Sequence, residues 1–301
     1  MQKHQYIPGT FPWIVPGLLR GRVAVVTGGA GAVCGALCEL LALHGCDVVC
    51  ADQSRSRVEA VVARIQEIGQ VGVPVVTNLR TAEGMQEVLQ ATTGVFSHVD
   101  ILVNGMGENL DSWGPFEETN EEIWQALYEV NLLNVLRACH LFVPIMKKGG
   151  WGRILNFSSV EGIRSAPWLG VYTAFKRAVD AFTKSMAVDI ARHGILANAL
   201  ALDKVRAYQS NHYALPDEYL GLVKTWIPAG RYGEPADAAQ VALFLASPLN
   251  TWIVGQTIVA DGGTLAAGGW YRTTKRWTNQ PLLVQHLEPS EINETRPKPV
   301  Q

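Results

Sequence analysis

Three residues with chemically useful side chains, a serine, a tyrosine and a lysine, lie near one another in the sequence. Tyr172 and Lys176 are four positions apart, so on a helix they share one face, with Cβ atoms roughly 5 to 6 Å apart. A tyrosine with a pKa of about 10 is a poor base, but a neighbouring ammonium group favours the phenolate. The spacing therefore predicts that Lys176 lowers the pKa of Tyr172 and makes it a general acid/base. Ser159 ends the strand-like run RILNFSS, where its hydroxyl can hydrogen-bond the oxygen that Tyr172 protonates or deprotonates.

A Tyr-x-x-x-Lys pair is equally typical of an ordinary helix face, so the rest of the chain has to decide. The 301 residues, 48% hydrophobic and 17% charged, are enough for a large core in one domain or at most two. A net charge of -2 without a block of like charges argues against nucleic acid or an anionic membrane as partner. No apolar run reaches about 18 residues, and prolines interrupt the first 20 residues where a signal peptide has its apolar core. We therefore expect a cytoplasmic protein.

Four of the five cysteines gather in one short region, which raises the question of a disulfide or metal cluster. Cys34 and Cys38 fall on a predicted helix, and Cys46 and Cys50 fall around the following predicted strand. His44 is the single histidine near them, without ligand spacing. We expect buried, reduced thiols and no metal site.

Residues 23–52 have the pattern of a dinucleotide-binding unit. Residues 23–26 predict a buried parallel strand, residues 28–31 a glycine-rich turn and residues 34–44 a helix. Residues 46–51 predict a second strand, which Asp52 closes. In such a unit, backbone N–H groups at the helix N-terminus face the pyrophosphate, and the terminal acid binds the adenosine ribose hydroxyls.

This region resembles the classical short-chain dehydrogenase/reductase family, whose turn reads TGxxxGxG. Thr27 and Gly28 match that turn, whereas Ala32 and Cys34 replace its second and third glycines, and the thiol predicts a slightly reshaped phosphate cradle. The resemblance covers about residues 20–265 and implies an α/β fold, a single Rossmann-type, doubly wound parallel sheet with helices on both faces. It divides the chain into an N-terminal extension (1–20), the Rossmann domain (21–265) and a C-terminal extension (266–301).

The resemblance implies a nicotinamide dinucleotide cofactor. Asp52 repels a 2′-phosphate and so favours NAD over NADP, while Arg55 and Arg57 keep NADP open as the less favoured cofactor. Asn78 stands where the family commonly has an aspartate that contacts adenine, and its amide oxygen can still accept a hydrogen bond. The predicted cofactor-binding residues are Thr27, Gly28, Gly31, Ala32, Val33, Asp52, Gln53, Asn78, Leu79, Asn104, Gly105, Tyr172, Lys176, Leu202 and Val205.

Asn131 completes a four-residue catalytic set that the resemblance implies. It lies among apolar residues in a predicted helical region over 117–146, and a buried amide must find hydrogen-bond partners. In the family, an asparagine here holds a water that relays protons to the lysine; the alternative is a core amide with satisfied hydrogen bonds. The predicted catalytic residues are Asn131, Ser159, Tyr172 and Lys176.

Two predicted strand ends depart from the family. The segment that corresponds to NNAG reads NGMG over residues 104–107, and Asn104 is expected to have a mainly structural role. After the sixth predicted strand, Leu202 and Asp203 replace a Pro-Gly pair beside the nicotinamide. A carboxylate there either hydrogen-bonds the carboxamide or a backbone N–H, or weakens cofactor binding, and the sequence leaves both open.

Residues 206–226 predict a loop with helical pieces over the open end of the sheet, where substrates bind in such folds. Its aromatic residues favour a bulky apolar substrate, although a packed structural lid explains them equally well. The predicted substrate-binding residues are Ser159, Glu161, Trp168, Tyr208 and Tyr213.

Together, these features predict an NAD-dependent oxidoreductase that interconverts a hydrophobic secondary alcohol and its ketone. Hydride would pass between C4 of the nicotinamide and the carbinol carbon, Tyr172 would move the proton, Ser159 would hold the reacting oxygen, and Lys176 would bind the nicotinamide ribose. The resemblance also implies a homotetramer or homodimer, and we expect residues 266–287 to dock on a neighbouring subunit. Two alternatives stay open: a catalytically silent cofactor-binding protein, and an epimerase or dehydratase that uses the same cofactor.

Overall fold

A computed structural model describes residues 17–207, 223–269, 271–272 and 277–278. These residues belong to two units. The first unit contains residues 17–207 and 233–261, and the second contains residues 223–232 and the described residues from 262 onward. The predicted boundaries after residues 20 and 265 remain a prediction.

Short apolar runs of sequence form a seven-stranded sheet in the first unit, and every strand runs parallel to its neighbours. The strands lie in the order β3-β2-β1-β4-β5-β6-β7. The winding reverses between β1 and β4, the switch point where doubly wound sheets bind ligands. The predicted fold class is confirmed. The strands are β1 Val23–Thr27, β2 Asp47–Asp52, β3 Gly72–Val76, β4 Ile101–Asn104, β5 Gly152–Ser159, β6 Ile195–Leu202 and β7 Thr257–Ala260.

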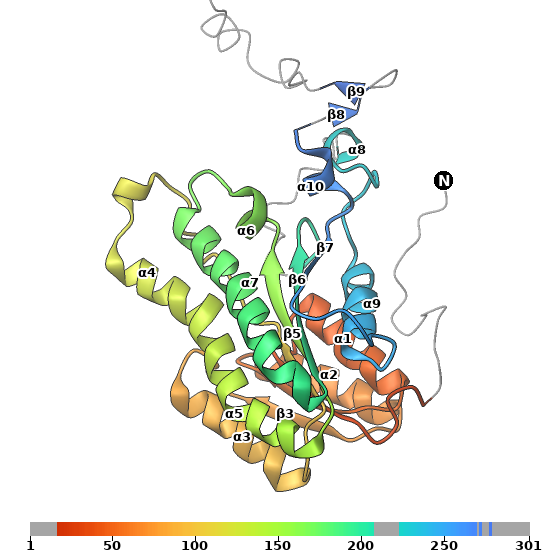
Figure 1. Ribbon diagram of the computed structural model, residues 1–301. Coiled ribbons are helices and arrows are strands. Elements are labelled where there is room, and N and C mark those ends of the chain that lie inside the picture. The colour runs from red at the N-terminus through yellow and green to blue at the C-terminus, as the bar shows by residue number, and fades with distance from the viewer. Residues whose placement is uncertain (1–16, 208–222, 270, 273–276, 279–301) are drawn as a thin grey trace, which may run out of the picture. The chain divides into compact units, whose positions relative to one another are not determined.

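Helices cover both faces of this sheet (Figure 1). On one face α1 packs against α2 and α9, and on the other α3 packs against α5, with α7 beside β5 and β6. The helices of the first unit are α1 Ala32–Leu43, α2 Arg55–Glu67, α3 Ala82–Val95, α4 Glu121–Tyr128, α5 Asn134–Gly149, α6 Glu161–Arg164, α7 Gly170–Ile190 and α9 Pro235–Ala246, with 3-10 turns at Phe116–Glu118 and Ala191–His193. None of the helices in the described ranges is long and apolar enough to cross a membrane.

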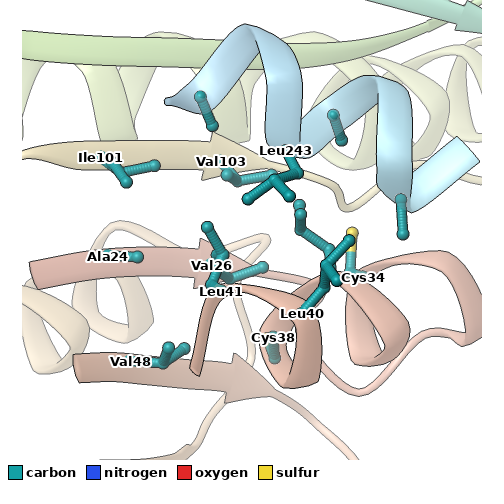
Figure 2. Close-up of a cluster of buried hydrophobic side chains, with 14 of the residues drawn as sticks. Ala24, Val26, Cys34, Cys38, Leu40, Leu41, Val48, Ile101, Val103 and Leu243 are labelled. Carbon is teal, nitrogen blue, oxygen red and sulfur yellow. The ribbon is translucent and has the colours of Figure 1, made fainter. Parts of the chain in front are cut away.

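The central strands β1, β4 and β5 are buried along their whole length because helices cover both faces of the sheet. Neighbouring residues of a strand point to opposite faces: Val26 of β1 packs with α1 and α9, and Val25 packs on the side of α3, α5 and α7. Figure 2 shows Leu243 of α9 and Leu41 of α1 meeting Val26 and the strands beside it. Burying each such side chain stabilises the fold by about 1.5–3 kcal/mol. Apolar runs such as Val23 to Val26 in β1 are what make parallel strands recognisable in a sequence.

The helical region predicted over 117–146 is divided in the structure. Asn120 begins α4, and its side-chain oxygen accepts the N–H of Ile123 at 3.0 Å. A π-helical turn, Glu129–Leu133, then interrupts the regular hydrogen bonding before α5 begins. Single π-helical turns are frequent at functional sites, and this one contains Asn131.

The second unit contains two short helices and a strand pair. They are α8 Val223–Trp226, α10 Thr264–Ala267, and the antiparallel strands β8 Tyr271–Arg272 and β9 Trp277–Thr278. Within this unit the Ala229 N–H donates to the Gly262 carbonyl at 2.9 Å. Most of the predicted lid and of the segment expected to dock on a neighbour lies outside the described residues.

Candidate active site

A cleft of about 360 Å³ crosses the carboxyl ends of β2, β1, β4, β5 and β6. Neighbouring strands are about 4.8 Å apart, so the cleft spans roughly 19 Å from β2 to β6. Its length suits an extended dinucleotide, with Asp52 at one end and Asp203 at the other. Most of the predicted cofactor-binding residues line it: Gly28, Gly31, Ala32, Val33, Asp52, Gln53, Asn78, Leu79, Gly105, Tyr172, Lys176, Leu202 and Val205.

Two residues predicted to bind the cofactor, Thr27 and Asn104, lie in the sheet and do not line the cleft. They are paired in register at the ends of β1 and β4, and both are buried. The Thr27 hydroxyl donates to the Val103 carbonyl at 3.4 Å, and the Asn104 amide donates to the Asn156 side-chain oxygen at 2.8 Å. They therefore fix the strand ends beneath the cleft, which is the structural role expected of Asn104.

The turn between β1 and α1 leaves backbone N–H groups available to an anion. Gly31 precedes α1 without a side-chain cap, and the first helical turn carries no acid. Gly28 has a φ of 67°, and a Cβ at this position would lie 2.8 Å from the backbone nitrogen of Met106. The uncapped N–H groups and the dipole of a 12-residue helix favour a phosphate. The turn therefore fits the pyrophosphate of a dinucleotide.

Cys34 stands where the family has a glycine, and Gly105, a second departure from the family pattern, leaves room for its side chain. Its buried sulfur lies against Gly105, where an added Cβ would overlap it. Burial raises the pKa of Cys34 to about 12, so the thiol is neutral and does not repel phosphates. The absence of a side chain at Gly105 therefore offsets the added bulk of Cys34, whose sulfur packs against the end of β4. All five cysteines are free and buried, as predicted.

Asp52 ends β2 and lines the cleft where the acid for the ribose was predicted. Its carboxylate accepts the N–H of Ser54 at 3.1 Å and lies 3.7 Å from the guanidinium of Arg57. Arg57 also lines the cleft, whereas Arg55 pairs with Glu59 on the surface. This end of the cleft therefore offers both an acceptor for ribose hydroxyls and a cation.

Ser159 and Tyr172 meet where β5 ends and α7 begins. The Ser159 hydroxyl accepts the N–H of Glu161 at 3.2 Å, and it lies close enough to Tyr172 to influence the pKa of the phenol. Burial raises the pKa of Tyr172 to about 12, while the neighbouring Ser159 hydroxyl lowers it and the Glu161 carboxylate raises it further. The prediction of a lowered tyrosine pKa is therefore wrong here, because burial of the phenol outweighs the other influences.

Lys176 is buried one turn further along α7. Its Nζ donates to the Phe157 carbonyl at 3.2 Å and lies 5.8 Å from the centroid of the Tyr172 ring. Burial lowers the pKa of Lys176 to about 8, and Asp180 raises it. The lysine thus lies beside the tyrosine, as the spacing predicted, in an environment that disfavours its charge.

Asn131 is held next to Lys176 by the loop that follows β4. Its amide nitrogen donates to the carbonyls of Glu108 at 2.8 Å and Leu127 at 3.0 Å, and its oxygen accepts the Glu108 N–H at 3.1 Å. A Cβ at Gly107 would contact both this oxygen and the Nζ of Lys176. The four predicted catalytic residues are therefore brought together, and the main chain satisfies the Asn131 amide, as the alternative of a core amide requires.

Two of the other predicted substrate-binding residues, Glu161 and Trp168, lie between β5 and α7. Glu161 begins α6 and binds the guanidinium of Arg164. Trp168 has a φ of 65°, is 64% exposed, and lines a second pocket of about 170 Å³. Tyr208 and Tyr213 lie outside the described residues.

Asp203, whose role the sequence left open, forms an ion pair with Arg164. Its carboxylate lies 3.1 Å from the guanidinium, and its side chain is 3% exposed. Nothing in the local sequence marks Arg164 as a partner. Other missed residues had a usable signal, since they lie in or after the carboxyl ends of parallel strands or in the adjoining helical region. They are Arg80, Gly107, Glu108, Leu110, Val130, Phe157, Ser158 and Ala207.

Comparisons with known proteins agree with this geometry. A family model described as Enoyl-(Acyl carrier protein) reductase matches residues 29–264. The 3-oxoacyl-[acyl-carrier-protein] reductases of Vibrio cholerae and Thermotoga maritima are 35% and 33% identical, each over 81% of this chain and 98% of the relative. The structure of L-sorbose reductase from Gluconobacter frateurii, complexed with NADPH and L-sorbose, has a TM-score of 0.76 at 24% identity, over 82% of this chain and 97% of that one. This chain therefore belongs to the classical short-chain dehydrogenase/reductase family and is an oxidoreductase.

Proposed function

We propose that the protein interconverts an apolar secondary alcohol and its ketone with NAD as cofactor. The observation that carries the proposal is that Tyr172 and Lys176 both line a cleft long enough for a dinucleotide, with Ser159 beside Tyr172 at the end of β5. The nicotinamide, when bound, supplies the hydride chemistry. The chain itself binds and orients the reactants and moves the proton.

Each catalytic side chain has a separate task. Tyr172, with its pKa raised to about 12, is protonated at neutral pH and is suited to donate a proton to the oxygen of a ketone under reduction. Ser159 donates a hydrogen bond to the same oxygen. Lys176, with a pKa of about 8, still carries its charge at pH 7 and binds the nicotinamide ribose. Asn131 fixes the loop that follows β4 next to Lys176 through its hydrogen bonds to Glu108.

NAD is proposed over NADP because of Asp52. Its carboxylate lines the cleft at the end of β2, where it accepts hydrogen bonds from ribose hydroxyls and repels a 2′-phosphate. The ion pair with Arg57 engages the cation that a 2′-phosphate would need. The NADPH complex of L-sorbose reductase supports the opposite choice, so the two cofactors have to be compared directly.

An apolar substrate is proposed because aromatic side chains gather beside the start of α7. The pocket of about 170 Å³ is lined by Val171, the residue before Tyr172, by Trp168 and by the stacked rings of Phe116 and Trp124. A cavity of about 150 Å³ holds one benzene-sized group. The pocket therefore suits a ring or short alkyl group of a substrate whose reacting carbon lies at Tyr172.

Backbone strain in the described residues concentrates in the same loops. The non-glycine residues with positive φ are Leu110, Asp111, Ser165 and Trp168. Such conformations persist where the surroundings impose them, often at ligand sites. The strain supports a binding role for the loops at 108–116 and 165–170.

The proton-transfer role is tested by Tyr172→Phe, measured as the reduction rate of apolar ketones such as acetophenone. We expect kcat to fall roughly 10²–10⁴-fold with cofactor affinity retained, because the ring remains and the proton donor is lost. The matched control is Tyr128→Phe, since Tyr128 packs on Phe175 and does not line the cleft. Unchanged turnover in Tyr172→Phe would refute the assignment.

A further inference from the structure

An acid–arginine–acid network closes one end of the cleft. Asp203 directly follows β6, is almost fully buried, and lies 3.1 Å from the Arg164 guanidinium. Arg164 also donates to both carboxylate oxygens of Glu161, at 3.1 and 2.7 Å. Because one guanidinium faces two carboxylates, the network carries one net negative charge.

The network is joined to the catalytic residues. The backbone N–H of Glu161 donates to the Ser159 hydroxyl, and the N–H of Val160 donates to the Leu202 carbonyl at 3.0 Å. Asp203 lines the same cleft as Tyr172 and Lys176. Asp203 therefore lies at the end of the cleft where the proposed redox reaction takes place, and its carboxylate is buried behind the cleft lining.

The order of the strands fixes which part of a dinucleotide meets this charge. Asp52 is at the end of β2, and Asp203 follows β6, four strands away. If Asp52 binds the adenosine ribose, the nicotinamide lies at the β5–β6 end. That ring is cationic when oxidised and neutral when reduced, so a nearby buried charge distinguishes the two forms.

We propose that Asp203 gives the site a preference for the oxidised dinucleotide and that Arg164 limits this preference by compensating the Asp203 charge. The inference rests on the proposed function, because it requires a nicotinamide in the cleft. Removing Asp203 makes the network neutral, and removing Arg164 leaves two negative charges. Replacements of the two partners therefore act in opposite directions. A pair that only ties α6 to β6 would instead weaken both forms of the cofactor alike.

The test is the ratio of the dissociation constants for NAD⁺ and NADH, measured by titrating the full-length protein at constant ionic strength. We expect Asp203→Asn to weaken NAD⁺ relative to NADH by roughly tenfold, and Arg164→Gln to shift the ratio the other way. The double variant keeps one net negative charge and should lie between them, close to the wild type. The double variant can also be measured if either single variant fails to fold because the remaining member of the ion pair has lost its partner.

The control is Arg64→Gln, which breaks the ion pair with Glu39 between α2 and α1, away from the cleft lining. It should leave the ratio unchanged. If both dinucleotides bind but the ratio is the same in all variants, the inference is overturned and the proposed function stands. If the wild-type protein binds neither dinucleotide, the proposed function itself fails and the inference with it.

Discussion

Lys176 carries its charge at a position where burial disfavours it. Its pKa is about 8 in the folded protein, against an ordinary value of 10.5, so folding at neutral pH includes the burial of an ammonium group. The hydrogen bond to Phe157 and the neighbouring Asp180 offset part of this penalty. A buried charged residue with a shifted pKa is typical of functional sites, where catalytic groups often reduce the stability of the fold.

This penalty predicts how stability depends on pH. Between about pH 8 and 10.5 the unfolded chain holds the Lys176 proton and the folded protein has lost it, so this group makes the folded state more stable as pH rises. This lowering of the Lys176 pKa corresponds to a change of about 3 kcal/mol at most in the free energy of unfolding. The Lys176→Met variant should therefore have a larger free energy of unfolding than the wild type at pH 7. This difference in stability should shrink toward pH 9.5. Urea unfolding at the two pH values measures it.

The matched control is Lys184→Met, an exposed position on the same helix. It should show no such pH-dependent difference. A constant difference between Lys176→Met and the wild type at both pH values would contradict a lowered lysine pKa.

For Tyr172, residue spacing predicts the position of the side chain but not its pKa. The sequence correctly predicted that Tyr172, Lys176 and Ser159 come together, because helix periodicity and a strand end suffice for that. It predicted the direction of the tyrosine pKa wrongly, because burial of the phenol depends on distant segments. The Arg164–Asp203 pair was missed for the same reason: its partners are 39 residues apart on different elements.

At the scale of elements, the bounds of β1 and β2 and the turn between β1 and α1 were predictable within one residue. Continuous apolar runs define strands covered on both faces, and glycines define the turn. The division of residues 116–149 into a 3-10 turn, α4, a π-helical turn and α5 was not predicted. The π-helical turn depends on how the Asn131 amide meets the loop at Glu108, and local propensity does not contain that contact.

The packing of α1 on β4 predicts a coupled pair of substitutions. Gly105→Ala should destabilise the protein by about 1–3 kcal/mol, because the new methyl group would overlap the Cys34 sulfur. In a Cys34→Gly background most of that effect should disappear, since the sulfur is gone. Urea unfolding of the four proteins in this double-mutant cycle measures the coupling.

The control is Gly94→Ala in α3, where an added Cβ meets nothing within 4 Å. It should be neutral or slightly stabilising. Equal effects of Gly105→Ala in both backgrounds would mean that Cys34 and Gly105 do not compensate each other.

At the scale of the whole molecule, an apolar hollow lies on the outer side of α5 and α7. It measures about 590 Å³ and is lined by Leu136, Arg137, Cys139, His140, Val143, Pro144, Phe182 and Met186. Monomers rarely keep large apolar patches exposed. We therefore propose that this face joins subunits of the homotetramer or homodimer that the family resemblance implies.

Phe182→Glu should break this contact, because it places a charge in the hollow. We expect light scattering after size exclusion to report a smaller assembly than for the wild type. The control is Val95→Glu, at an exposed position at the end of α3, which should leave the mass unchanged. An unchanged mass for Phe182→Glu would exclude this face as the interface.

The most direct test of the proposed NAD-dependent site is a calorimetric titration of the purified full-length protein with NADH and, separately, with NADPH. We expect NADH to bind at least roughly tenfold more tightly, because Asp52 accepts from the ribose hydroxyls and repels a 2′-phosphate. The Asp52→Ala variant should show a smaller difference between the affinities for NADH and NADPH. Tighter binding of NADPH would contradict the choice of NAD, and binding of neither would contradict the dinucleotide site itself.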